Sequence, residues 1–222
     1  MEMKKVFFPV LSCFIIAGIL TSSPSVKKIG EPIPVVNEDT LINVKGKKVL
    51  FIGDSHTANH SYGWQKVLCD KTGMVMKNTS VGGKNTYWML NMAVYTANKT
   101  FDYCFIYGGA NDMYSSTSMI DAVYNIKGII KICKGNGITP VVMTGFSPEL
   151  CVEKNKYSVY ISRYSKFQQM LLDSIKDAKV IKSHFVTRKD GDCGDYICHM
   201  TAKGHKKMGE GVIKEMKFKV IK

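Results

Sequence analysis

The sequence predicts an α/β fold, a three-layer α/β/α sandwich with a central parallel sheet. Short apolar runs of strand length recur along residues 47–222, and stretches with the spacing of amphipathic helices lie between them. Strands that alternate with helices favour a parallel sheet covered on both faces. The chain has 222 residues, which is long enough for one substantial core.

Five apolar runs have the length and composition of buried strands. In chain order they are Lys48–Ile52, Met74–Asn78, Tyr103–Tyr107, Pro140–Thr144 and Val180–Ser183. A helical pattern begins near Tyr62, after the first of these runs. Each run is therefore expected to form one strand of the sheet.

Three later stretches place apolar residues three or four positions apart, which is the spacing of one helix face. The first contains Met119, Ile120, Val123, Ile126, Ile130 and Cys133, and the second contains Tyr160, Tyr164, Phe167, Leu171 and Ile175. The third contains Met208, Val212, Ile213 and Met216. Thr201 is expected to cap the N-terminus of this last helix.

The N-terminus has the pattern of an export signal. Two lysines precede an apolar run from Val6 to Leu20, and small polar residues follow it. This arrangement predicts a signal peptide over residues 1–25, with an uncleaved N-terminal anchor as the alternative. Residues 26–46 are interpreted as a linker, and residues 47–222 as the single folded domain. The expected location is secreted, periplasmic or at the cell envelope.

Gly53-Asp54-Ser55-His56 follows the first predicted strand directly. A serine just past the carboxyl end of a strand lies where open α/β sheets bind their ligands. Taken alone, the same residues also fit a turn that caps a helix. Three later segments favour the functional interpretation, namely Gly83, Gly109-Ala110-Asn111-Asp112 and His199.

These four segments, in this order, resemble the conserved blocks of the SGNH hydrolase superfamily, also called the GDSL esterase/lipase family. Ser55 matches the serine of the first block, although His56 stands where many members have leucine. Gly83 matches the second block, Asn111 the third and His199 the last. The resemblance runs from about Lys47 to the C-terminus and implies a flavodoxin-like SGNH hydrolase fold.

The resemblance implies a serine esterase that works through an acyl-enzyme. Ser55 would be the nucleophile and His199 the base that takes its proton. The oxyanion hole would consist of the backbone N–H groups of Ser55 and Gly83 and the side-chain amide of Asn111. This chemistry needs no cofactor.

The acid that orients His199 is displaced from the family pattern. The family has an aspartate three residues before the histidine, and here that position is Tyr196. Asp195, four residues before His199, is the favoured partner, and Asp192 is the second candidate. A backbone carbonyl that orients the ring is the third alternative.

Seven cysteines bear on the compartment and on metal binding. Cys193 and Cys198 lie on either side of the acid segment, and export would permit a disulfide between them. Cys104 and Cys133 fall on predicted core faces and are expected to be buried thiols. The spacing of Cys193, Cys198 and His199 matches no strong zinc pattern, so no metal site is predicted.

The formal net charge is +13, with lysines spread along the chain. A solvated basic surface is the simplest explanation, and attraction to an anionic cell-envelope surface or an acidic polysaccharide is the functional one. Nucleic acid is not an expected partner, because the lysines form no compact patch with interleaved aromatics. His56 and Trp88 are candidates to line the active-site cleft.

The sequence thus predicts an exported serine esterase that hydrolyses a small acyl ester, such as an O-acetyl group on a glycan. Three alternatives remain open. They are a lipase or thioesterase, an O-acetyltransferase acting on cell-wall sugar, and a non-catalytic carbohydrate-binding relative. The oligomeric state is not predicted.

Overall fold

A computed structural model describes residues 40–195 and 199–221 of the chain. The predicted signal or anchor segment, residues 1–25, lies outside the described residues. Five strands form one parallel sheet in the order β2-β1-β3-β4-β5. The strands are β1 (Lys48–Gly53), β2 (Val75–Asn78), β3 (Tyr103–Tyr107), β4 (Thr139–Met143) and β5 (Lys179–Ile181).

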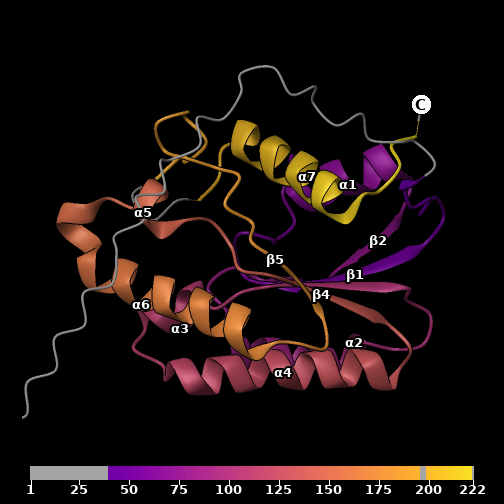
Figure 1. The fold of residues 1–222 in the computed structure, drawn as a ribbon, viewed down its shortest axis with the longest axis horizontal. Coiled ribbons are helices and arrows are strands. Elements are labelled where there is room, and N and C mark those ends of the chain that lie inside the picture. Colours follow the sequence, from indigo (N-terminus) through magenta and orange to yellow (C-terminus); the bar gives the residue numbers. More distant parts are fainter. Residues whose placement is uncertain (1–39, 196–198, 222) are drawn as a thin grey trace, which may run out of the picture. The chain divides into compact units, whose positions relative to one another are not determined.

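Helices cover both faces of this sheet (Figure 1), which confirms the predicted three-layer α/β/α architecture. One face carries α1 (Trp64–Thr72) and α7 (Ala202–Met216). The other carries α2 (Thr86–Thr96), α3 (Ala110–Tyr114), α4 (Met119–Gly135) and α6 (Lys154–Ser174). The short helix α5 (Pro148–Cys151) follows β4.

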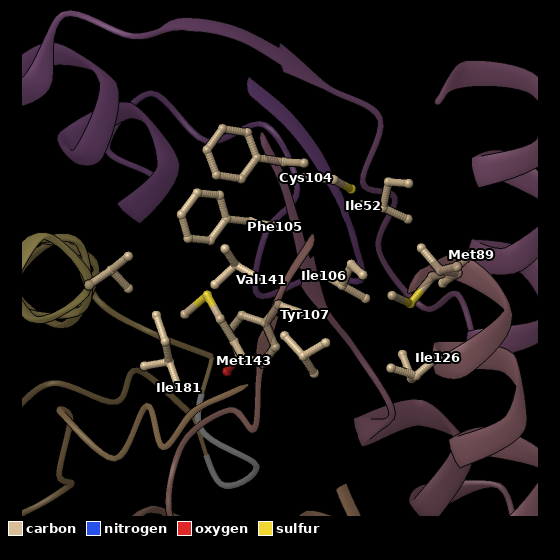
Figure 2. Close-up of a cluster of buried hydrophobic side chains, with 14 of the residues drawn as sticks. Ile52, Met89, Cys104, Phe105, Ile106, Tyr107, Ile126, Val141, Met143 and Ile181 are labelled. Carbon is tan, nitrogen blue, oxygen red and sulfur yellow. The ribbon is translucent and has the colours of Figure 1, made fainter. Parts of the chain in front are cut away.

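The central strands are apolar because the sheet has no solvent-facing side. Residues Val49–Ile52 of β1 and Cys104–Tyr107 of β3 have no exposed surface. Successive side chains point to opposite faces, and Figure 2 shows Phe105 on one side and Ile106 on the other. Ile106 lies on the side of Met89 from α2 and Ile126 from α4 (Figure 2).

The five predicted strands all form, with ends that differ from the predicted ones by at most two residues. The helix face predicted from Met119 to Cys133 is correct except at Ile120, which is 57% exposed. The buried face of α4 has its edge at Val123. A step of three residues falls about 60° short of a full helical turn. Ile120, three residues before Val123, therefore lies about 60° beyond Val123, outside the buried face.

The order of the strands places a site between β1 and β3. The chain leaves β1 towards β2 on one side and leaves β3 towards β4 on the other. The two connections therefore diverge at the carboxyl ends of β1 and β3, and ligands bind at such a point in open α/β sheets. Ser55 follows β1, and Asn111 follows β3.

The described end of the predicted linker, residues 40–46, packs against the domain. Val44 is 1% exposed. The Ile42 N–H donates to the carbonyl of Lys217, and the Lys219 N–H donates to the carbonyl of Ile42, at 2.8 and 2.9 Å. The packed unit therefore begins before Lys47. None of the helices in the described ranges has the length and apolar character needed to cross a bilayer.

Candidate active site

Ser55 and His199 lie 144 positions apart in the chain, and the fold brings their side chains into contact. The Ser55 Oγ lies 2.9 Å from the His199 Nε2. Ser55 lies in the turn after β1, and His199 lies just before α7. Helix α7 packs on α1 across the same face of the sheet, and this packing holds His199 over the end of β1.

The second ring nitrogen of His199 contacts Asp195. The Asp195 Oδ2 bonds to the His199 Nδ1, and the Asp195 Oδ1 accepts the His199 backbone N–H at 2.8 Å. One carboxylate therefore fixes both the backbone and the ring of the histidine. The side chain of Asp192 is bound elsewhere. Its Oδ2 accepts the Lys207 Nζ and the Thr187 N–H, each at 2.9 Å.

The segment that carries Asp195 is tied to the rest of the domain. The Arg188 guanidinium donates to the Asp195 carbonyl, and its Nε donates to the Cys151 carbonyl at 2.8 Å. The Gly194 N–H donates to the His199 carbonyl at 2.7 Å. Cys193 is disulfide-bonded. Its predicted bridge to Cys198 stays a prediction, because Cys198 lies outside the described residues.

Three groups that could stabilise an oxyanion line the same cavity as Ser55. The backbone N–H groups of Ser55 and Gly83 have no acceptor within the part of the chain that the structure describes. Gly83 has φ of 75°, which non-glycine residues rarely adopt, although a Cβ there would meet nothing within 4 Å. The Asn111 Nδ2 donates to the Lys84 carbonyl at 3.0 Å. Its second amide hydrogen remains for a ligand.

Asp112 joins the segment of Asn111 to the segment of Gly83. The Asp112 carboxylate accepts the Thr86 N–H at 2.9 Å and the Thr86 hydroxyl at 2.7 Å. Both residues are fully buried. Because Thr86 is the first residue of α2, this pair fixes the loop before α2 against the start of α3.

The cavity at this site has a volume of about 270 Å³. Its lining combines the predicted functional residues with aromatic side chains, and consists of Ser55, His56, Gly83, Ala110, Asn111, Tyr114, Tyr160 and His199. A second cavity, of about 540 Å³, shares Gly83, Asn111 and Tyr114 with it and also contacts Trp88. Both His56 and Trp88 thus lie at the cleft, as the sequence suggested.

Burial shifts the pKa of several titratable groups in and near the site. Burial raises the pKa of the Asp54 carboxyl to about 7, although the His56 N–H partly opposes this shift. Burial lowers the pKa of His56 to about 3 and that of His205 to about 4. Both histidines are therefore neutral at pH 7. The His205 Nδ1 accepts the backbone N–H of Trp64 at 3.2 Å, which ties α7 to α1.

A family model for the GDSL-like Lipase/Acylhydrolase family matches residues 51–207. The chain belongs to this family. The match includes every segment that forms the site, from the end of β1 into α7, and family membership makes the protein an ester hydrolase. Among curated proteins, no significant match was found.

Solved structures of low sequence identity share the fold of this GDSL-family chain. A lipolytic protein of the G-D-S-L family from Desulfitobacterium hafniense is 17% identical over 76% of this chain and 99% of its own, with a TM-score of 0.65. The psychrotrophic esterase EstA from Pseudoalteromonas is 17% identical over 77% and 97%, with a TM-score of 0.62. An acetylxylan esterase from Geobacillus stearothermophilus is 14% identical over 80% and 98%, with a TM-score of 0.63.

The structure places all five predicted site residues at one site, and it adds two tyrosines. Tyr114 and Tyr160 line the cavity and contact each other with ring centroids 5.9 Å apart. Tyr160 was expected only as a core residue of its helix, and Tyr114 belongs to the five-residue helix α3, which is too short to give a periodic signal. Within residues 40–195 and 199–221, no cluster of three or more His, Cys, Asp or Glu side chains could hold a metal ion.

Proposed function

We propose that this GDSL-family protein is a serine esterase that forms an acyl-enzyme on Ser55. The observation that carries the proposal is the unbroken contact from Ser55 through His199 to Asp195. A serine hydroxyl is a poor nucleophile unless a base removes its proton, and the His199 Nε2 is within hydrogen-bonding distance of Oγ. Asp195 then holds the proton of His199 on Nδ1, which leaves Nε2 as the base.

In the proposed reaction, Oγ attacks the ester carbonyl carbon while its proton passes to the His199 Nε2. The carbonyl oxygen becomes an oxyanion and accepts hydrogen bonds from the N–H groups of Ser55 and Gly83 and from the Asn111 amide. The bond from the carbonyl carbon to the alcohol oxygen then breaks, and His199 protonates the departing alcohol. Water, activated by the same histidine, releases the acyl group from Ser55.

A small acyl group is the proposed substrate, with O-acetyl on a glycan as the leading example. The cavity at Ser55 has a volume of about 270 Å³, which suits a short acyl chain together with the nearest atoms of the alcohol. The adjoining cavity of about 540 Å³ is open to a larger polar partner and has Lys84, Asn85, Trp88 and Ser115 in its lining. A lipase or thioesterase would need room for a long acyl chain.

We further propose that the protein is exported and acts at an anionic envelope surface. The basic start and apolar run of residues 1–25 support export, with an uncleaved anchor as the alternative. The net charge of +13 supports attraction to anionic polymers or membranes.

The acyl chain length is tested by hydrolysis of p-nitrophenyl acetate, butyrate and octanoate. We expect the acetate to be hydrolysed with the highest kcat/KM. Faster hydrolysis of the octanoate would support a lipase, and faster acyl transfer to a sugar than to water would support a transferase. Binding of a glycan without hydrolysis of any ester would support a non-catalytic role.

The nucleophile is tested with Ser55→Ala, which should abolish turnover and leave the thermal unfolding midpoint near that of the wild type. A fluorophosphonate probe should label the wild type on Ser55. Ser162→Ala, at an exposed position on α6, is the control and should keep both activity and labelling. Full activity of Ser55→Ala would overturn the proposed mechanism.

A further inference from the structure

His56 follows the nucleophile directly, and hydrogen bonds hold its backbone on both sides. Its N–H donates to the Asp54 Oδ1 at 3.0 Å, and its carbonyl accepts the Trp64 indole N–H at 3.1 Å. Trp64 is fully buried at the start of α1. The backbone of His56 is therefore fixed both to the turn after β1 and to α1.

The side chain of His56 is held equally firmly. It is 4% exposed, and three rings surround it. Tyr107 stacks on it with centroids 5.6 Å apart, Phe146 lies at 5.0 Å, and His199 stacks on it at 5.2 Å with an interplanar angle of 24°. The imidazole of His56 thus lies beside the ring proposed as the general base, in a single orientation.

The two ring nitrogens of His56 have different surroundings. Nδ1 is buried and has no hydrogen-bond partner among the described residues, whereas the residue as a whole lines the cavity at Ser55. Nε2 is therefore the ring nitrogen that can reach a ligand in the cavity. Burial lowers the pKa of His56 to about 3, so the ring carries a single proton at neutral pH.

That proton belongs on Nε2. On Nδ1 it would form a buried N–H without an acceptor, which loses the hydrogen bond that it makes in water. A proton on Nε2 can instead be donated to an oxygen in the cavity. The ring of His56 consequently offers a neutral hydrogen-bond donor next to the Ser55–His199 pair. A neutral donor at this position does not repel the imidazolium that forms on His199 during the reaction.

We infer that His56 is a substrate-binding residue whose Nε2–H donates to a second oxygen of the departing alcohol, next to the scissile ester bond. The inference rests on the proposed function. His199 passes its proton to the alcohol oxygen, so the ring stacked on His199 lies on the alcohol side of the ester. The preferred substrates are then esters of polyols, sugars among them, rather than esters of simple alkyl alcohols.

Two acetate esters of equal size test this preference. 2-Hydroxyethyl acetate and n-propyl acetate differ only in whether the alcohol ends in a hydroxyl or a methyl group. We expect the wild type to favour the hydroxyethyl ester in kcat/KM by about tenfold, the effect of one hydrogen bond between neutral groups. p-Nitrophenyl acetate, which has no such hydroxyl, measures the basal reaction.

Three substitutions of His56 separate the effect of its hydrogen-bond donor from the effect of its ring. His56→Phe keeps a ring against His199 without a donor, and His56→Leu removes both. Each should abolish the preference, so that kcat/KM is about equal for the hydroxyethyl and the propyl ester. His56→Gln restores an N–H donor and should recover part of the preference. His184→Leu, at a half-buried histidine that does not line this cavity, is the control and should keep the wild-type ratio.

The outcomes distinguish this inference from the proposed function. If the wild type hydrolyses p-nitrophenyl acetate but shows no preference between 2-hydroxyethyl acetate and n-propyl acetate, the inferred role of His56 is overturned. The proposed esterase function is then unaffected. The same conclusion would follow if His56→Phe kept the preference. Failure of the wild type to hydrolyse any of the three esters would overturn the proposed function instead. Thermal unfolding midpoints show which variants are folded.

Discussion

At the scale of single residues, hydrogen bonds show which of two carboxylates contacts His199. The sequence favours Asp195 for this role and keeps Asp192 as the second candidate. Asp195 binds the ring and the backbone of His199, whereas the fully buried Asp192 binds Lys207 and the Thr187 N–H. A carboxylate that holds a lysine and a backbone amide stabilises the loop. Among the described residues, no hydrogen bond joins the Asp192 carboxylate to the ring of His199.

We therefore expect Asp195→Asn to lower kcat/KM on the order of 10³-fold or more, because an amide stabilises the imidazolium form of His199 poorly. Asp192→Asn is the matched comparison, and we expect it to cost about 1–3 kcal/mol of unfolding free energy with a smaller loss of activity. Equal, small losses of activity in both variants would mean that a backbone carbonyl orients His199.

Asp54 gives a pH signature of its own. Its Oδ2 is buried without a partner among the described residues, and burial raises the pKa of the carboxyl from 3.8 to about 7. The folded protein therefore binds this proton more tightly than the unfolded chain does. The contribution of Asp54 to stability is present below pH 4 and declines as the pH rises towards 7.

Asp54→Asn should remove this dependence, because the amide has the shape of the protonated carboxyl and does not ionise. Relative to this variant, the wild type should lose on the order of 4 kcal/mol of unfolding free energy between pH 4 and pH 7, from a shift of about three pKa units. Urea unfolding of both proteins at several pH values measures the difference. A constant difference across this range would contradict a raised pKa for Asp54.

At the scale of the elements, the start of α3 explains how Asn111 is positioned. Gly109 precedes α3 with φ of 105°, and a Cβ at this residue would lie 2.3 Å from the Phe167 ring of α6. Both the backbone conformation and the space require glycine here. The turn between β3 and α3 therefore depends on α6, an element that lies more than forty residues later in the chain.

Gly109→Ala should destabilise the protein by about 2 kcal/mol or more, because a left-handed φ and a steric overlap are combined. It should also lower kcat by moving Asn111. Gly135→Ala is the control, since Gly135 is helical, has no left-handed φ, and a Cβ there meets nothing within 4 Å. That substitution should be neutral or stabilising by up to about 1 kcal/mol. Chemical denaturation and ester hydrolysis check both variants, and equal behaviour would contradict the steric argument.

The elements that sequence periodicity did not single out are α2, α3 and α5. Helices α3 and α5 have five and four residues, too few to establish a period. Helix α2 is apolar on several sides, and its Tyr87, Val94 and Tyr95 are 61–83% exposed. Its apolar residues therefore do not mark a single buried face. By contrast, the face predicted from Tyr160 to Ile175 is buried at all five positions, four on α6 and the fifth at the residue that follows it, because α6 packs along one side only.

At the scale of the whole molecule, the basic charge and the N-terminal segment concern where the protein works. The net charge of +13 belongs to the chain as a whole, and the predicted signal lies outside the described residues. Export would also supply the oxidising environment in which the disulfide at Cys193 is stable. These features support one another as parts of the same proposal.

Expression of the full chain in a secreting host tests export. We expect the mature protein to begin between about Ser22 and Lys27, because a signal peptidase cuts after the small residues that follow the apolar run. Intact-mass measurement locates the cut. A chain without residues 1–25 is the control and should stay inside the cell. Recovery of the uncut chain in the membrane fraction would support the anchor instead.

The sequence by itself predicted the parallel α/β architecture, which the structure confirms, and it supplied the candidates for the nucleophile, the base and the oxyanion groups. Apolar runs reveal strands that are buried on both faces, and Ser55, Gly83 and Asn111 each lie in a short local motif next to such a strand or a glycine turn. Only the tertiary structure decided which carboxylate reaches His199 and which ring lies against it. Both depend on the packing of α7 over α1 and the end of β1, which brings residues 144 positions apart within 2.9 Å. Local sequence patterns do not encode contacts over such a separation, because those contacts form only when the layers pack.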